Sequence, residues 1–77
     1  MQNIYLLKDL AKRSGITTHT LKFYLRVGLF KEIGRWPETQ FRYFNDSSYE
    51  TLKKIKALQK KNFTLKQIQD YLKDDNG

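Results

Sequence analysis

The sequence predicts a mainly α-helical domain of four helices, with a small β-hairpin between the second and third helices. Three observations support this fold class. Apolar side chains recur at spacings of three and four in four segments, and glycine or asparagine stands where three of these segments end. One irregular stretch contains the only proline and then a run of aromatic residues. No linker divides the chain, so we expect residues 1–77 to form a single domain.

The first helix is predicted from about Leu7 to Ser14, because Leu7, Leu10 and Ala11 give it one apolar face. Gly15 follows at the position where a glycine commonly ends a helix.

The second helix is predicted to start at Thr17 or Thr18, either of which can cap it, and to run to about Val27. Gly28 ends it, and Tyr24 belongs to its apolar side.

A glycine turn links these two helices. Ala11, Gly15 and Leu21 are separated by four and six residues, which is the spacing of a helix-turn-helix. In that motif a small residue lies where the helices touch, glycine makes the turn, and a long apolar residue anchors the second helix.

The stretch Lys31–Asn45 is predicted to form a β-hairpin whose second strand alternates around Arg42. We expect Phe41, together with Tyr43 or Phe44, to anchor this strand in the core. A helix-turn-helix followed by such a hairpin is a winged helix-turn-helix.

The third helix is predicted from about Asp46 to Lys61, with Asn45 as its N-cap. Its apolar residues repeat every three positions: Tyr49, Leu52, Ile55 and Leu58.

The fourth helix follows a break at Asn62 and Phe63. Thr64 and Gln67 have the spacing of a capping box at its start. Its buried face is predicted to contain Leu65, Ile68 and either Tyr71 or Leu72.

The chain is strongly basic, with 15 Lys and Arg against 8 Asp and Glu and a net charge of +7. Residues 1–45 carry +5 and residues 46–69 carry +4, whereas the tail from Asp70 carries −2. This balance favours a polyanionic partner, most simply nucleic acid. The alternative is that the lysines only solvate exposed helix faces.

The composition argues against several other functions. Without cysteine there is no disulfide, thiolate metal site or cysteine nucleophile, and a single histidine cannot build a usual zinc site. No apolar run approaches the roughly 20 residues of a membrane span, and the N-terminus lacks a signal-peptide pattern. We therefore expect a cytoplasmic, nucleoid-associated protein that has no cofactor and is not an enzyme.

Four motifs follow one another at consistent spacing. Leu10–Ile16 reads as a first helix and turn, and Thr20–Leu29 as a recognition helix ending in Gly-Leu. Phe41–Phe44 stands at the wing, and Asn62–Ile68 at the start of a last helix. Together they resemble the DNA-binding domain of the MerR family of bacterial transcriptional regulators, over Tyr5–Leu72. The resemblance implies a winged helix-turn-helix that binds double-stranded DNA.

Several positions depart from the family pattern. Lys22 stands where an arginine is usual, Phe23 replaces a tyrosine, and Leu25 replaces an acid. Asn62 takes the place of a glycine, which its tolerance of the left-handed conformation permits. Members of the family continue into a dimerisation helix and an effector domain. We therefore expect no small-molecule effector site within these 77 residues.

The second helix, the wing and the resemblance together select the candidate DNA-binding residues. Thr18 and His19 are the best candidates for base edges, whereas Lys22 and Arg26 are expected to hold phosphates. His19 has the alternative of an exposed residue without a partner, and Tyr24 that of a core residue. By the resemblance, Lys60 and Lys61 precede a second wing. The predicted set is Thr17, Thr18, His19, Lys22, Phe23, Tyr24, Arg26, Arg35, Arg42, Tyr43, Lys60 and Lys61.

The sequence thus predicts sequence-specific binding of double-stranded DNA by a transcriptional regulator, with the second helix in the major groove and the wing on the backbone or minor groove. RNA polymerase and further copies of the chain on DNA are candidate partners. One alternative is an excisionase-like architectural DNA-binding factor. The other is a MerR-like adaptor that binds protein and not DNA, which would not need positive charge at Lys22, Arg26 and Arg42.

Overall fold

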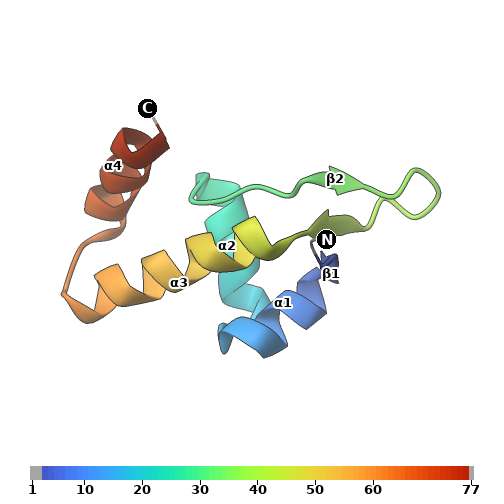
Figure 1. Ribbon diagram of the computed structural model, residues 1–77, viewed down its shortest axis with the longest axis horizontal. Helices are drawn as coiled ribbons and strands as arrows, with labels where there is room; N and C mark the ends of the chain where they lie inside the picture. Colours follow the sequence, from blue (N-terminus) through green and yellow to red (C-terminus); the bar gives the residue numbers. More distant parts are fainter. Residues whose placement is uncertain (1–2, 77) are drawn as a thin grey trace.

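The computed structural model describes residues 3–76, with side chains up to residue 73. These residues form four helices and a small sheet. Figure 1 shows the hairpin at one end of the molecule and α4 at the other. The four helices and the hairpin between the second and third are therefore confirmed. In chain order the elements are β1 (Tyr5–Leu6), α1 (Leu7–Ser14), α2 (Thr18–Val27), β2 (Gly34–Arg35), β3 (Arg42–Phe44), α3 (Asp46–Lys60) and α4 (Leu65–Asn76).

The first two helices end at glycines, as predicted. Gly15 has φ 75° and Gly28 has φ 81°, the left-handed conformation that favours glycine because it lacks a Cβ atom. The N–H of Gly15 donates to the Ala11 carbonyl over 2.9 Å, and the N–H of Gly28 donates to Leu25 over 3.3 Å. These bonds satisfy carbonyls that a helix end otherwise leaves without a partner.

The hairpin belongs to a larger sheet than the sequence predicted. The strand order is β1-β3-β2 with both pairs antiparallel, so the N-terminal strand β1 adds to the hairpin. Tyr5 pairs with Phe44, and Leu6 pairs with Tyr43. A two-residue strand is too short to show the alternation by which strands are recognised in a sequence.

The third and fourth helices begin as predicted. Asn45 caps α3, since its side-chain oxygen accepts a hydrogen bond from the Ser48 N–H over 3.2 Å. At α4 the Gln67 side chain accepts from the Thr64 N–H over 2.8 Å, which is half of the predicted capping box. The other half is the Thr64 hydroxyl, which accepts from the Gln67 N–H over 3.2 Å. Helix α3 ends at Lys60, one residue earlier than expected.

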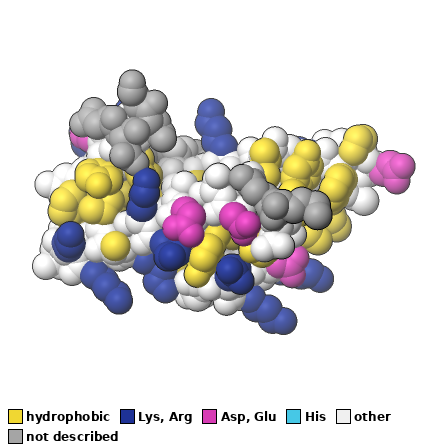
Figure 2. All heavy atoms as spheres, in the orientation of Figure 1, with side chains coloured by type: hydrophobic (Ala, Val, Ile, Leu, Met, Phe, Trp, Pro, Cys, Tyr) yellow, Lys and Arg dark blue, Asp and Glu magenta, His cyan; other side chains and the backbone are white. Residues whose placement is uncertain are grey.

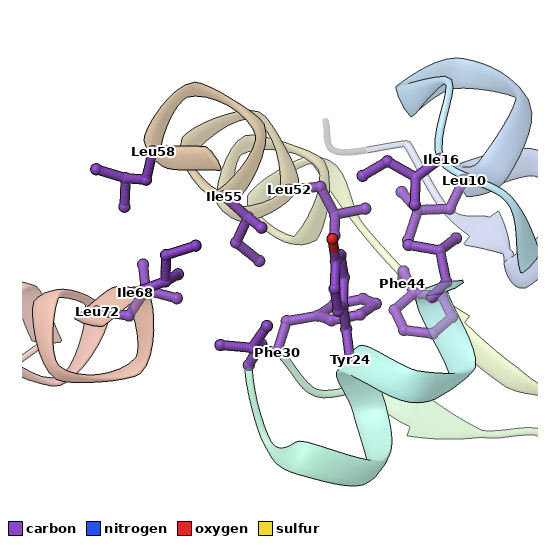
Figure 3. Close-up of a cluster of buried hydrophobic side chains, with 12 residues drawn as sticks. Leu10, Ile16, Tyr24, Phe30, Phe44, Leu52, Ile55, Leu58, Ile68 and Leu72 are labelled. Atoms are coloured by element: carbon purple, nitrogen blue, oxygen red, sulfur yellow. The ribbon is translucent and has the colours of Figure 1, made fainter. Parts of the chain in front are cut away.

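The core joins all four helices to β3 (Figure 3). Its fully buried side chains are Leu10, Leu21, Phe44, Leu52, Ile55 and Ile68. In α4, Leu72 and not Tyr71 completes the buried face, which resolves the alternative left by the sequence.

The expected anchoring role of Phe41 is wrong. Its side chain is 59% exposed, whereas Phe44 is fully buried. Successive side chains of a strand point to opposite faces, so two residues separated by three positions cannot both face the core. Phe44 therefore anchors β3 alone, and Arg42 shares its face.

A polar contact joins β1 to the first turn of α3. The Tyr5 hydroxyl donates to Asp46 Oδ1 over 2.7 Å, and the Asn3 N–H donates to Asp46 Oδ2 over 3.2 Å. The Tyr5 hydroxyl, followed by the Asn3 N–H, holds the pKa of Asp46 below its ordinary value. The contact therefore stabilises the fold while Asp46 is ionised.

This contact predicts a pH-dependent effect of Tyr5→Phe. Because the pKa of Asp46 is lower in the folded state, its stabilising effect is full above the unfolded value of about 3.9 and disappears as the pH falls through the folded value. The thermal midpoint of Tyr5→Phe should therefore lie below that of the unsubstituted protein at pH 7, and the difference should shrink in acid. Melting curves across the acid range measure this. A difference independent of pH would assign the loss to ring packing.

Candidate nucleic-acid interface

The exposed face of α2 is polar and basic. Thr18, Lys22 and Arg26 follow one another at intervals of four, so they lie on one side of the helix, with His19 beside them. All four side chains are exposed, whereas Leu21 on the opposite side is fully buried. The structure thus presents four of the predicted contact residues together.

Thr17 defines the start of this face. Its hydroxyl oxygen accepts a hydrogen bond from the Thr20 N–H over 3.2 Å, and its hydroxyl donates to the Thr20 side chain over 3.0 Å. Thr17 is therefore the N-cap of α2, which resolves the choice between Thr17 and Thr18.

The two aromatic residues of α2 occupy different environments. Tyr24 is only 4% exposed, and its hydroxyl accepts a hydrogen bond from the Gln59 amide of α3 over 2.9 Å. Figure 3 shows this hydroxyl directed toward α3. Phe23 is half-buried, and the Arg26 guanidinium lies 5.5 Å from the centre of its ring. Tyr24 is thus part of the core, and Phe23 supports Arg26 through a cation–π contact.

The wing, which we define as residues 34–44, has an aromatic and a basic side. Trp36 stacks on Tyr43 with the ring centres 4.7 Å apart. A side chain at Gly34 would collide with the Tyr43 ring, so the glycine makes room for it. Arg35 and Arg42 are partners across the two strands.

A groove lies where the start of α1, the middle of α2 and the wing meet. It encloses about 490 Å³. Four of its lining residues are basic, and we call it the basic groove. Its lining residues are Leu6, Leu7, Lys8, Lys22, Arg35, Gln40, Phe41 and Arg42. The structure thereby brings Lys22, Arg35 and Arg42 to one place.

Lys8 is the groove residue that the sequence reasoning missed. It lies two residues after the end of β1, and β1 pairs with the second strand of the wing, so this pairing brings Lys8 to the groove. The only signal in the sequence was a lysine in the first turn of a helix, where the helix dipole favours acidic residues.

The acidic side chain of Glu32 contacts two arginines of the basic groove. Glu32 Oε2 lies 3.2 Å from Arg35 Nε and 3.7 Å from Arg42 Nε. A hydrogen bond from its own backbone N–H, and then the guanidinium of Arg35, hold the pKa of Glu32 below its ordinary value. Glu32 is therefore ionised at neutral pH, and it offsets one of the four positive charges of the groove.

Lys60 and Lys61, which precede the predicted second wing, are not among the residues that line the basic groove. Lys60 and Lys61 are exposed at the end of α3, away from the hairpin along the 39 Å long axis (Figure 1). In Figure 2, Lys and Arg side chains follow the lower margin of the face drawn, and hydrophobic side chains gather over the hairpin.

Lys56 has a structural role, because its ammonium donates to the Ser14 carbonyl at the end of α1 over 2.9 Å.

Within residues 3–76, no helix is long and apolar enough to cross a membrane. The described side chains also contain no group of three or more His, Cys, Asp or Glu that could hold a metal ion.

The sequence matches the family described as MerR HTH family regulatory protein over residues 5–75. The mercuric resistance operon regulatory proteins of Shigella flexneri and Serratia marcescens are 31% and 30% identical to it over 67 residues. Those residues are 87% of this chain and 46% of each relative, so the chain spans about half the length of the curated relatives it matches.

Two solved structures are similar to this one. A MerR-family transcriptional regulator from Bacillus cereus has a TM-score of 0.85 at 21% identity, covering 91% of this chain and 52% of that one. HiNmlR, a MerR family regulator lacking the sensor domain and bound to promoter DNA, has a TM-score of 0.85 at 29% identity, covering 95% and 55%. The predicted winged helix-turn-helix fold is thus confirmed.

The capping role of Thr17 predicts a loss of stability. Thr17→Ala leaves the Thr20 N–H without its acceptor and should lower the free energy of unfolding by about 1 kcal/mol. Thr17→Ser keeps the hydroxyl and should stay close to the unsubstituted protein. Urea denaturation measures both variants. Equal stability of the alanine and serine variants would show that the cap contributes little.

Proposed function

The chain belongs to the MerR family of helix-turn-helix regulatory proteins, and we propose that it acts as a transcriptional regulator that binds double-stranded DNA sequence-specifically. The observation that carries this proposal is the basic groove, where Lys8, Lys22, Arg35 and Arg42 converge beside the exposed face of α2. A hollow lined by four cations on a chain of net charge +7 is suited to a phosphate backbone. That HiNmlR was solved on promoter DNA supports the same function.

In the proposed complex α2 enters the major groove. Its ten residues are about 15 Å long, and its exposed face starts at the N-terminal turn, where recognition helices meet base edges. Thr18 and His19 face the bases there. Lys22 and Arg26, one and two turns further along, hold phosphates.

The wing and the basic groove hold the DNA backbone. Arg35 and Arg42 are on the wing, Lys8 is at the start of α1, and Lys22 connects this group to α2. Because the four side chains come from α1, α2 and both strands of the wing, a strand of DNA that follows α2 meets the wing without leaving the positive surface. Lys60 and Lys61 form a second anchor toward the other end of the molecule.

A single module of this size covers little DNA. Small DNA-binding domains bury about 600–1,000 Å² of protein surface, which limits how many bases one copy can read. Further copies of the chain on neighbouring sites, or RNA polymerase at a promoter, would supply the additional contacts. We infer that the protein is a binding protein and not an enzyme, and that it works on DNA of the nucleoid in the cytoplasm.

The proposal predicts a measurable salt dependence. The logarithm of the affinity for a labelled duplex should fall linearly with the logarithm of the salt concentration, by about 0.9 per phosphate neutralised. Lys8→Ala, Lys22→Ala and Arg42→Ala should each lower this slope by roughly one unit, because each removes one phosphate contact. Fluorescence anisotropy titrations of a random-sequence duplex at several salt concentrations measure the slopes.

Lys73→Ala is the matched control for these titrations. It removes the same charge from an exposed position on α4, far from the hairpin, and should change the slope less than Lys8→Ala does. Equal effects of the two variants would mean that charge acts diffusely and that the groove is not the site. Absence of duplex binding at low salt would favour the protein adaptor instead.

The assignment of α2 to base recognition predicts a change in sequence preference. Thr18→Ala and His19→Ala should each cost about 1–3 kcal/mol on the preferred site and little on random DNA. Arg42→Ala and Lys60→Ala should weaken both by a similar factor, since phosphates carry no sequence information. Selection from randomised duplexes, followed by affinities on the selected and a scrambled site, measures this. An unchanged selected motif for Thr18→Ala and His19→Ala would remove α2 from base recognition.

A further inference from the structure

Glu32 lies between the two arginines of the wing, and among the described residues it is the only carboxylate that contacts them. Glu32 Oε2 contacts Nε of Arg35 and of Arg42, and these two arginines lie directly opposite each other across β2 and β3. We propose that Glu32 is a positioning residue that holds both guanidiniums together as one clamp for a single DNA phosphate. This inference rests on the proposed function and assigns a role to an acidic residue within its site.

The exposure of the three side chains argues against the opposite role, in which Glu32 would compete with the phosphate. The Glu32 side chain is 26% exposed, whereas those of Arg35 and Arg42 are 46% and 39% exposed. The Glu32 side chain is thus the most covered of the three. A phosphate arriving from solvent therefore meets the guanidiniums first.

The atoms used in these contacts leave the binding ends of the arginines available. Both contacts use Nε, on the side edge of the guanidinium. These contacts leave the terminal Nη atoms of Arg35 and Arg42 for a second acceptor, and Nη atoms match the geometry of a phosphate. One oxygen of Glu32 can thus accept a hydrogen bond from Arg35 and attract Arg42 without occupying the ends that would hold DNA.

Repulsion between Arg35 and Arg42 explains why the clamp requires Glu32. Like charges directly opposite each other in an antiparallel pair destabilise it, and they drive their side chains apart. Glu32 reduces this repulsion by lying between Arg35 and Arg42. Without it the two guanidiniums would separate, and DNA binding would have to order them again at a cost in affinity.

Arg42 is not fully satisfied in the free protein. Its Nε atom is buried and makes no hydrogen bond within the described part of the chain. The nearest carboxylate oxygen is Glu32 Oε2 at 3.7 Å, which is longer than a hydrogen bond. A small movement of Arg42 toward Glu32 would give this nitrogen an acceptor. The two guanidiniums can therefore move closer together around an anion.

The experiment compares two substitutions that change the charge equally. Glu32→Gln and Glu38→Gln each remove one negative charge from the hairpin region with little change of shape. Glu38 is exposed on the turn of the wing and forms no ion pair with a described residue, so it is the matched control. Anisotropy titrations of a random-sequence duplex against salt give affinity and slope for each.

Simple electrostatics and the clamp predict opposite signs for Glu32→Gln. Removing an acid near DNA should strengthen binding and raise the salt slope, and Glu38→Gln should behave in this way or not change. The clamp predicts that Glu32→Gln binds about 2- to 10-fold more weakly, the cost of ordering one long side chain. Glu32→Gln binding as tightly as Glu38→Gln, or more tightly, would overturn the proposal.

A second comparison separates positioning from a general effect on folding. In the background Arg35→Ala with Arg42→Ala, the change Glu32→Gln should no longer weaken binding, because nothing is left to position. Continued weakening there would make Glu32 a structural residue and sink the clamp. If Glu32→Gln is unfolded by circular dichroism, Glu32→Asp replaces it, since it keeps the charge and shortens the reach. Loss of affinity in Glu32→Asp supports the clamp, and unchanged affinity contradicts it.

Failure of the clamp is distinguishable from failure of the proposed function. If the unsubstituted protein binds no duplex at low salt, the DNA-binding proposal itself fails. If it binds, and only the sign of the Glu32→Gln effect differs from expectation, the DNA-binding proposal stands and the clamp is rejected.

Discussion

The interface depends on the pairing of β1 with β3. This pairing, Tyr5 with Phe44 and Leu6 with Tyr43, is short, but it joins the chain ahead of the helix-turn-helix to the second strand of the wing. Phe44 is fully buried, so the strand that β1 joins is itself fixed to the core. A hairpin projecting from a small helical domain would otherwise be held only at its base. Because β1 runs directly into α1, the position of the wing and the position of the helix-turn-helix are set together.

The alternation of side chains along β3 then separates two surfaces. Phe44 faces the core and Arg42 lies on the same face of the strand, so the arginine is directed to the side where α1 and α2 pack. Tyr43 faces the other way and is covered by Trp36. One strand of three residues thus provides an anchor, a cation for the basic groove, and an aromatic contact that supports the turn. The aromatic contact lies on the face opposite the groove, so it supports the wing without filling the space proposed for a phosphate.

The sequence predicted those features that local chemistry encodes. Apolar periodicity and capping residues located both ends of the first three helices and the start of the fourth to within a residue or two, because Gly15, Gly28 and Asn45 act through neighbouring backbone groups. Features that depend on contacts between distant segments were missed. The β1–β3 pairing joins residues about 40 positions apart, and with it the arrival of Lys8 in the groove could not be predicted. The placement of Phe41 failed for a different reason, since two aromatic residues three positions apart suit a helix face and not a strand face.

Polar side chains of the last two helices hold α1 and α2 in place within this frame. Lys56 of α3 donates to the Ser14 carbonyl at the end of α1, and Gln69 of α4 donates to the Val27 carbonyl at the end of α2 over 2.8 Å. The Gln59 amide of α3 donates a third hydrogen bond, to the Tyr24 hydroxyl of α2. Each contact fills a group that apolar packing alone would leave without a partner, and each links elements distant in the chain. The Gln59 and Gln69 contacts join α2 to α3 and α4, and the Lys56 contact joins α1 to α3. Because hydrogen bonds are directional, these contacts restrict how the first two helices can rotate against the last two. A surface that is already rigid loses less conformational entropy when it binds a duplex. Less of the electrostatic attraction is then offset by the cost of ordering, and the affinity is higher.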